Sequence, residues 1–122
     1  MLKAYEYRCA VCGFDVRLGS VSIALDAAHI RWHQAGGPDE ETNGLALCVL
    51  HHKTFDLGAF TVAEGIMLVS DQVHGTSGFR EALMAHHGGK IREPQRPDWG
   101  PEPRHLAWQR REVFKGAPRY HG

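Results

Sequence analysis

Apolar and polar positions divide the first half of the chain into short elements. Residues 21–32 (VSIALDAAHIRW) are rich in β-branched and apolar side chains, which favours a strand. Two glycines and a proline interrupt the pattern at residues 33–42 and indicate a loop, and the apolar stretch at 43–48 follows a turn signal. Residues 49–58 (VLHHKTFDLG) predict a short helix that Gly58 ends. This half therefore predicts a hairpin followed by a helix.

The second half predicts another hairpin and two helices. Residues 59–73 have the pattern of two strands around a tight turn at Glu-Gly. Residues 78–89 carry apolar side chains at helical spacing. Four prolines mark residues 92–103 as a linker, and residues 103–116 have a proline near the start and a glycine past the end of a final helix. The elements together predict the α+β class.

Length and charge refine this picture. The 122 residues suit one domain with a modest core. Residues 1–78 hold five Lys/Arg against nine Asp/Glu, whereas residues 79–122 hold nine against five. We expect residues 1–78 to form the core and residues 79–122 a helical, basic extension of the same domain that binds DNA through Arg104, Arg110 and Arg111. A solvated tail without a partner is the alternative.

Cysteine usage points to a metal. No apolar run approaches the length of a membrane-spanning helix, and the N-terminal residues lack the apolar segment of a signal peptide. We therefore expect a cytoplasmic protein without membrane contact. In that compartment, three cysteines, two of them in a C-x-x-C pair, predict metal binding instead of disulfides.

Two ligand pairs have the spacing of a zinc site. They are Cys9-x-x-Cys12 and Cys48-x-x-His51, with 35 residues between the pairs. Zinc prefers four tetrahedral thiolate or imidazole ligands, and a pair spaced by two residues can chelate it from one turn. Buried free cysteines are the alternative, but they do not explain the repeated spacing. We expect a structural Zn²⁺ that pins two distant turns together.

A second group of side chains is independent of that cluster. His29 lies on the predicted strand, Asn43 follows the loop, and His52 and Asp56 lie on the predicted short helix. Neighbouring residues on a helix point about 100° apart, so His51 can serve the zinc while His52 faces elsewhere. Asp56 follows His52 by one turn, so the two can hold a divalent cation between them.

The ordered motifs C-x-x-C, A-H-I, N-G-L and C-x-x-H-H-x-x-x-D resemble the HNH endonuclease family, whose core is the ββα-metal fold. The pattern extends from about Arg8 to Phe60. It is most similar to HNH enzymes among the modification-dependent restriction endonucleases, including those that cut phosphorothioate-modified DNA. The combination is specific, although no single motif is. The resemblance implies a ββα-metal core with a zinc knuckle, a following β-hairpin and a C-terminal helical tail.

The resemblance also implies roles for individual residues. His29 would be the general base, and Asn43 would hold the loop and orient the His29 ring through its amide. His52 would bind a catalytic cation such as Mg²⁺, Mn²⁺, Ni²⁺ or Co²⁺. Lys53, beside His52, is a candidate for phosphate contact.

One position departs from the family pattern. Many members have a metal-binding Asp or His directly before the general base, where this chain has Ala28. Asp26 has the same strand parity as Ala28, and Asp56 lies on the helix, so either can supply the carboxylate. The sequence leaves this choice open.

These features predict a metal-dependent endonuclease that hydrolyses DNA, as the cleavage domain of a restriction-type enzyme. A non-catalytic zinc module that binds nucleic acid or protein is the alternative, and it would not need His29, Asn43 or His52. The near-neutral net charge suggests that a separate domain or subunit supplies sequence recognition. A homodimer is a further alternative, and the sequence does not decide the oligomeric state. Five more histidines have no partner at ligand spacing and are expected at the surface: His74, His86, His87, His105 and His121.

Overall fold

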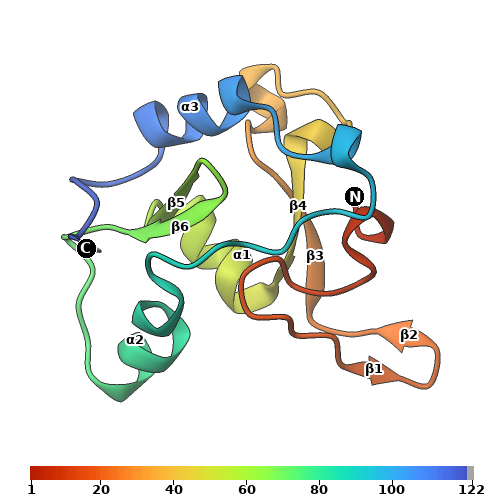
Figure 1. Ribbon diagram of the computed structural model, residues 1–122, viewed down its shortest axis with the longest axis horizontal. Coiled ribbons are helices and arrows are strands. Elements are labelled where there is room, and N and C mark those ends of the chain that lie inside the picture. The colour runs from red at the N-terminus through yellow and green to blue at the C-terminus, as the bar shows by residue number, and fades with distance from the viewer. Residues whose placement is uncertain (121–122) are drawn as a thin grey trace.

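The computed structural model describes residues 1–120, in which two antiparallel hairpins contact a central helix, a third hairpin projects at the edge, and two further helices follow (Figure 1). The strands are β1 Arg17–Leu18, β2 Val21–Ser22, β3 Leu25–His29, β4 Gly44–Cys48, β5 Phe60–Ala63 and β6 Ile66–Val69. The helices are α1 Val49–Asp56, α2 Ser77–Ala82 and α3 Pro103–Glu112. Short 3-10 helices lie at Lys3–Tyr5, His33–Ala35, Glu41–Asn43, Met84–His86 and Pro97–Trp99.

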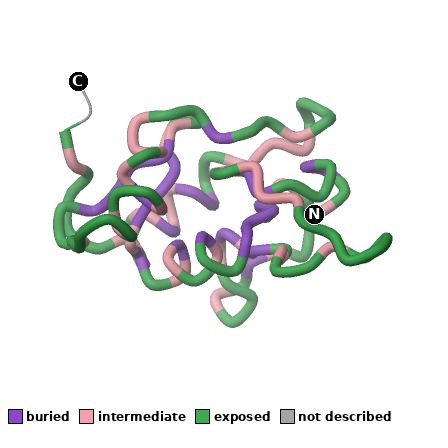
Figure 2. The backbone as a smooth tube through the Cα atoms, turned by 90° about the horizontal axis from the view of Figure 1, so that it is seen from below, coloured by how far each residue is buried: buried purple, intermediate pink, exposed green. Residues whose placement is uncertain are grey.

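Strands β3 and β4 and helix α1 form the ββα unit that the sequence predicts. The strands pair with His29 opposite Gly44 and Leu25 opposite Cys48, and α1 begins directly after β4. All five residues of β4 are buried, and buried segments run through the middle of the molecule (Figure 2). Because residues four apart share a helical face, α1 buries both His51 and Phe55. The predicted α+β class is therefore confirmed.

The C-terminal segment packs onto the β5–β6 hairpin. Helix α3 lies against β5, where the buried Gln109 side chain accepts a hydrogen bond from Thr61 Oγ1 at 2.6 Å and donates one to the Phe60 carbonyl at 3.1 Å. Leu106 and Val113, one turn to either side, are also buried. The extension thus contributes to the same core as β5.

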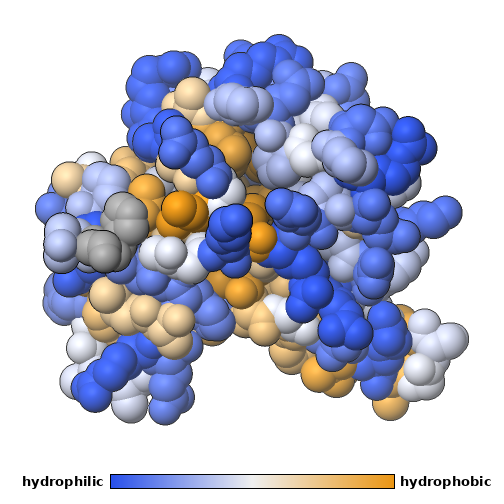
Figure 3. All heavy atoms as spheres, in the orientation of Figure 1, coloured by the Kyte–Doolittle hydropathy of each residue, from blue (hydrophilic) through white to orange (hydrophobic). Residues whose placement is uncertain are grey.

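The predicted strand at 21–32 is broken into two. Ala24 has a left-handed backbone (φ 56°), so β2 ends at Ser22 and β3 starts at Leu25. Strand β2 pairs with β1 in a small hairpin that the sequence did not predict. Its side chains Leu18 and Val21 are 74% and 63% exposed, and hydrophobic atoms gather in this part of the surface (Figure 3, lower right).

Both predicted C-terminal helices are shorter than expected. Helix α2 ends at Ala82, and a separate 3-10 turn covers residues 84–86. Helix α3 ends at Glu112. The chain then runs past the turn between α1 and β5, where Lys115 N–H donates to the Gly58 carbonyl at 3.0 Å. No helix within residues 1–120 has the length and hydropathy needed to span a bilayer.

The turn between β5 and β6 is as predicted. Glu64 and Gly65 both have left-handed backbones, with φ of 53° and 77°. This is the conformation that a two-residue hairpin of type I′ requires.

Candidate active site and metal centre

The structure brings the three cysteines and His51 into one cluster. Their ligand atoms all lie within 4.8 Å of one another. Cys48 Sγ is 3.2 Å from His51 Nδ1, and Cys12 Sγ is 3.9 Å from Cys48 Sγ. A tetrahedral zinc with bonds of about 2.0–2.3 Å separates its ligand atoms by roughly 3.5–3.8 Å. The four side chains therefore fit a zinc ion in identity and spacing.

The His51 ring is oriented by a contact on its far side. Its Nε2 lies 2.7 Å from the Ala82 carbonyl at the end of α2, so this nitrogen carries the hydrogen. The lone pair is then on Nδ1, which faces the sulfurs of Cys9 and Cys48. Histidine ligands of metals are commonly fixed in this way by a carbonyl or carboxylate on the other nitrogen.

Three sulfurs so close together cannot all be thiolates unless a cation balances them. The pKa of Cys9 is lowered to about 3, chiefly because the Cys48 thiol donates a hydrogen bond to its sulfur. The same contact raises the pKa of Cys48, and burial raises that of Cys12. Metal binding here would have to displace protons from Cys12 and Cys48.

A separate pocket gathers the second set of predicted residues. Its volume is about 470 Å³, and its lining includes His29 from β3 together with His52 and Asp56 from α1. Trp32 and His33, just after β3, line another part of it. The β3 histidine and the α1 imidazole–carboxylate pair thus open onto one shared space.

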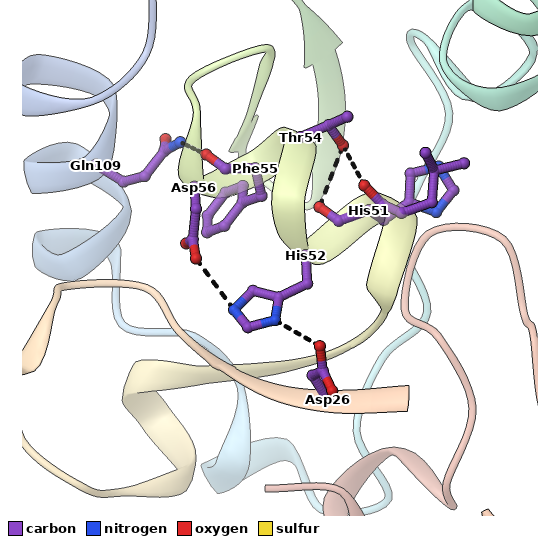
Figure 4. A network of polar contacts seen from close by, with 8 residues as sticks. Asp26, His51, His52, Thr54, Phe55, Asp56 and Gln109 are labelled. Atoms are coloured by element: carbon purple, nitrogen blue, oxygen red, sulfur yellow. Dashed lines mark hydrogen bonds and ion pairs between the residues drawn. The ribbon is translucent and has the colours of Figure 1, made fainter. Parts of the chain in front are cut away.

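His52 lies between two carboxylates (Figure 4). Its Nδ1 is 2.8 Å from Asp26 Oδ2, and its Nε2 is 3.1 Å from Asp56 Oδ2. A neutral imidazole has one N–H, so it can donate to only one of these carboxylates at a time. The other carboxylate then faces a nitrogen lone pair, and a cation between them would turn that contact into an attraction. Burial raises the pKa of Asp56, and the neighbouring His52 opposes this shift.

The donor set at His52 also fits a divalent cation. Ligand atoms at adjacent positions of an octahedral ion with bonds of 2.0–2.1 Å lie roughly 3 Å apart. Both contacts of His52 match that spacing. The two carboxylates touch opposite edges of the ring, however, so one ion beside one nitrogen would take His52 with Asp56 or with Asp26, but not with both. Asp56 lines the pocket that contains His29, whereas Asp26 is not among its lining residues.

Asn43 has a different role from the one that the resemblance implies. Its buried amide donates to the carbonyls of Arg31 (3.0 Å) and Pro38 (2.9 Å), and its Oδ1 accepts from Arg31 N–H (2.8 Å). The expectation that the amide orients the His29 ring by contact is wrong, because both of its N–H donors are used on loop carbonyls. The expectation that it holds the loop agrees with these bonds.

The ring of His29 instead contacts Asp39. Asp39 Oδ1 lies 3.1 Å from His29 Nε2. Sequence reasoning missed this residue, because ten positions of loop separate it from His29 and no spacing rule relates the two.

The predicted DNA-binding arginines are not equivalent. Arg110 is half-buried, and its Nη2 donates to the Val62 carbonyl at 3.0 Å, so its assignment to DNA is corrected to a structural role. Arg104 and Arg111 are exposed, and each pairs with a nearby glutamate on its own segment. Lys53 is exposed on α1, directly after His52.

Two tryptophans connect α3 to the pocket. Trp108 on α3 meets Trp32 edge-on, with ring centroids 5.8 Å apart, and Trp32 lines the pocket. Arg104 and Arg111 lie four residues before and three residues after Trp108, which places them on the same helical face. These two cations therefore lie on the side of α3 that faces the pocket rim.

The surface assignment of the remaining histidines is only partly right. His74 is exposed as expected. His105 is buried, with only 1% of its surface accessible. His86 packs edge-on against His51 at 5.6 Å, and His87 Nδ1 accepts a hydrogen bond from Val69 N–H. His121 lies outside the described residues.

Comparisons with known proteins agree with this geometry. The sequence model of a family described as HNH endonuclease matches residues 9–63. This range contains the Cys₃His cluster, the carboxylate–histidine group at His52 and the whole ββα unit. A solved structure described as the modification-dependent TagI restriction endonuclease is similar with a TM-score of 0.62 and 25% identity. The similarity covers 92% of this chain but only 35% of that one. A search among curated proteins found no match.

Proposed function

We propose that this chain, whose residues 9–63 match the sequence model of the HNH endonuclease family, is a metal-dependent endonuclease that hydrolyses DNA phosphodiester bonds. One observation carries the proposal: a single pocket joins His29 of β3 to the His52–Asp56 pair of α1. That pocket supplies a base and a cation-binding pair, the two functions that phosphodiester hydrolysis needs. A zinc module that only binds nucleic acid or protein would need neither.

The four-residue cluster would hold a structural zinc. Cys9 and Cys12 lie in the N-terminal turn, whereas Cys48 and His51 lie at the junction of β4 and α1. A zinc ion held there would fix the start of α1, and thereby the direction in which His52 projects. Binding energies on the order of 10 kcal/mol are typical of such sites, so the zinc would contribute decisively to folding.

The catalytic cation would be held by His52 Nε2 and Asp56. Asp26 would then accept the Nδ1–H of His52, because a carboxylate on the second nitrogen fixes the ring of a metal-bound histidine. When bound, such a cation stabilises negative charge on the phosphate and on the leaving oxygen. This division of roles assigns the carboxylate that the sequence left open to Asp56.

The protein's own residues supply the remaining chemistry. His29, which lines the same pocket, would take the proton from the attacking water. Asn43 would keep the loop beside His29 in place through its three backbone contacts. Lys53, with Arg104 and Arg111 on the pocket side of α3, would contact phosphates on either side of the cleaved bond.

Recognition of a DNA sequence or modification is proposed to come from outside this chain. The chain spans about a third of the restriction endonuclease that it resembles, and its net charge is zero. A neutral domain of this size is poorly suited to grip DNA alone. We therefore propose that residues 1–78 and 79–122 form one cleavage domain that works with a separate recognition domain, a partner subunit or a second copy.

The proposal is tested with supercoiled plasmid. The purified chain is freed of loosely bound metal and incubated with Mg²⁺, Mn²⁺, Ni²⁺ or Co²⁺, each with and without EDTA. We expect cation-dependent nicking or linearisation that His52→Ala abolishes while one zinc per chain is retained. Loss of zinc in His52→Ala would show that the roles of His51 and His52 are exchanged. Absence of cleavage with every cation, for a folded zinc-containing protein, would contradict the proposal.

The carboxylate assignment has its own test. Asp56→Asn should raise the cation concentration needed for half-maximal cleavage more than Asp26→Asn does, because only Asp56 is proposed as a ligand. The two variants remove the same charge from the two sides of His52, so each is the control for the other. A larger effect of Asp26→Asn would reverse the assignment.

A further inference from the structure

The loop between β3 and β4 carries a carboxylate to which no motif assigned a role. Asp39 Oδ1 lies 3.1 Å from Nε2 of His29, although the Asp39 side chain is 85% exposed. An exposed aspartate is usually free to leave such a contact. Whether this one is held depends on how its backbone is fixed.

One buried side chain fixes both ends of the contact. Asn43 donates to the carbonyl of Pro38, the residue directly before Asp39. The same amide group donates to and accepts from the backbone of Arg31, two residues after His29. Asn43 thus ties the segment that carries the carboxylate to the segment that carries the imidazole.

A second contact restricts the same loop. A Cβ atom added to Gly37 would lie 1.9 Å from the Arg31 carbonyl oxygen, so the loop backbone passes directly over the end of β3. Two residues before Asp39, the loop therefore lies directly against Arg31, just after the end of β3. Contacts at Gly37 and Pro38 thus hold the two residues directly before Asp39, which limits the directions in which its side chain can point.

We propose that Asp39 is a positioning residue that acts through His29. Its carboxylate accepts the hydrogen of Nε2, which leaves the lone pair of the neutral ring on Nδ1. During the reaction, Nδ1 takes a proton from water while the water oxygen forms a bond to phosphorus and the bond from phosphorus to the leaving 3′ oxygen breaks. The leaving oxygen takes a proton from solvent, and the carboxylate of Asp39 stabilises the imidazolium that forms on His29. The proposal rests on the proposed function, in which His29 is the general base.

Among the carboxylates of residues 33–42, only that of Asp39 forms an ion pair with His29. Both side-chain N–H groups of Asn43 donate to backbone carbonyls, so neither is available to His29. Glu41 lies on the same loop and is exposed, and it begins the 3-10 turn that leads into β4. It therefore provides a control carboxylate of the same charge, two residues away from Asp39.

The first test compares cleavage rates and DNA affinities. Asp39→Asn, Asp39→Ala and Glu41→Gln are measured in single-turnover cleavage at saturating DNA, with zinc content as the check on folding. Replacing the carboxylate partner of a catalytic histidine can cost about 10⁴-fold at a buried site, so roughly a 10- to 100-fold loss is expected for this exposed one. The DNA dissociation constant should stay within about twofold, and Glu41→Gln should cut at the parent rate. A parent-like rate for both Asp39 variants would overturn the proposal.

A double variant tests whether Asp39 acts through His29. In a His29→Ala background, Asp39→Ala should cause no further loss of rate. If the two losses multiply, Asp39 contributes independently of His29 and the positioning role is wrong.

The third test does not require activity. Nitrogen chemical shifts of the His29 ring, assigned by their loss in His29→Ala, report which nitrogen carries the hydrogen. We expect the hydrogen on Nε2 in the parent and a mixture of both tautomers in Asp39→Ala. A parent ring with the hydrogen on Nδ1 would overturn the proposal. If the parent protein does not cleave DNA but shows the Nε2–H form, the proposed function fails while the His29–Asp39 contact stands.

Discussion

Replacement of Asn43 by alanine should destabilise the whole domain as well as slow catalysis. The side chain is fully buried and makes three hydrogen bonds to the backbone of Arg31 and Pro38. Each such bond contributes about 1 kcal/mol net, so Asn43→Ala should lower the free energy of unfolding by about 3 kcal/mol. A domain of this size is typically stable by about 5–15 kcal/mol, so the variant should still fold.

Asn43→Asp distinguishes a loop-holding role from a ring-orienting role. Aspartate has nearly the same shape, but it would direct a carboxylate at the two carbonyls that now accept hydrogen bonds. We therefore expect Asn43→Asp to be at least as unstable as Asn43→Ala at neutral pH. If the residue acted by contact with the His29 ring, the aspartate would instead preserve much of the function.

The assay is urea denaturation at fixed zinc, with the midpoint and slope fitted separately. A lower midpoint at unchanged slope reports a loss of native stability. Gln95→Ala is the matched control, because its amide makes one exposed hydrogen bond to the Lys3 carbonyl and its loss should cost less than about 0.5 kcal/mol. Equal midpoints for Asn43→Ala and the parent, or a parent-like Asn43→Asp, would refute this account of the loop.

Three further predictions concern zinc, DNA and pH. Cys48→Ala should unfold or aggregate, and a soluble, folded variant without zinc by elemental analysis would exclude a structural metal. Reversing the charges of Arg104 and Arg111 should lower the salt dependence of DNA binding by a slope of about one per lost phosphate contact, whereas Arg110→Ala should lower the melting temperature and leave that slope unchanged. Burial lowers the pKa of His105, so the unfolded chain binds a proton near pH 6.5 that the folded chain does not. Stability should therefore fall as pH drops below that value, and an equal pH dependence of the melting temperature in His105→Phe would disprove this linkage.

The pairs of candidate metal ligands were predictable because each pair depends on local spacing along the chain. A Cys-x-x-His pair at a strand–helix junction presents both ligands from one turn, and His52 and Asp56 share a helical face. The neighbours His51 and His52 point apart for the same reason. Within each pair the relevant geometry spans at most five residues of chain.

Features that depend on tertiary structure could not be read from spacing. Strand parity placed Asp26 with Ala28, and it did not show that Asp26 reaches His52 on α1. A count of charges could not distinguish Arg110, which donates a hydrogen bond to the Val62 carbonyl, from its exposed neighbour Arg111.

Backbone conformation at single residues and the paths of loops could not be predicted from the sequence either. A single left-handed residue, Ala24, separates β2 from β3 in the stretch that the apolar pattern predicts as one strand, and β2 pairs with β1 instead. Asp39 meets His29 where hydrogen bonds from Asn43 hold the loop against the segment after β3. Neither event leaves a periodic signal in the sequence.

The central claim is that His29 is the base of a DNA hydrolase, and single-turnover cleavage of His29→Ala and His33→Ala tests it most directly. Both histidines line the same pocket, so the second variant controls for general damage to it. We predict that His29→Ala loses roughly 10²–10⁴-fold in rate while retaining zinc and DNA binding, and that His33→Ala stays within about tenfold of the parent. A His29→Ala protein that cleaves at the parent rate would contradict the account.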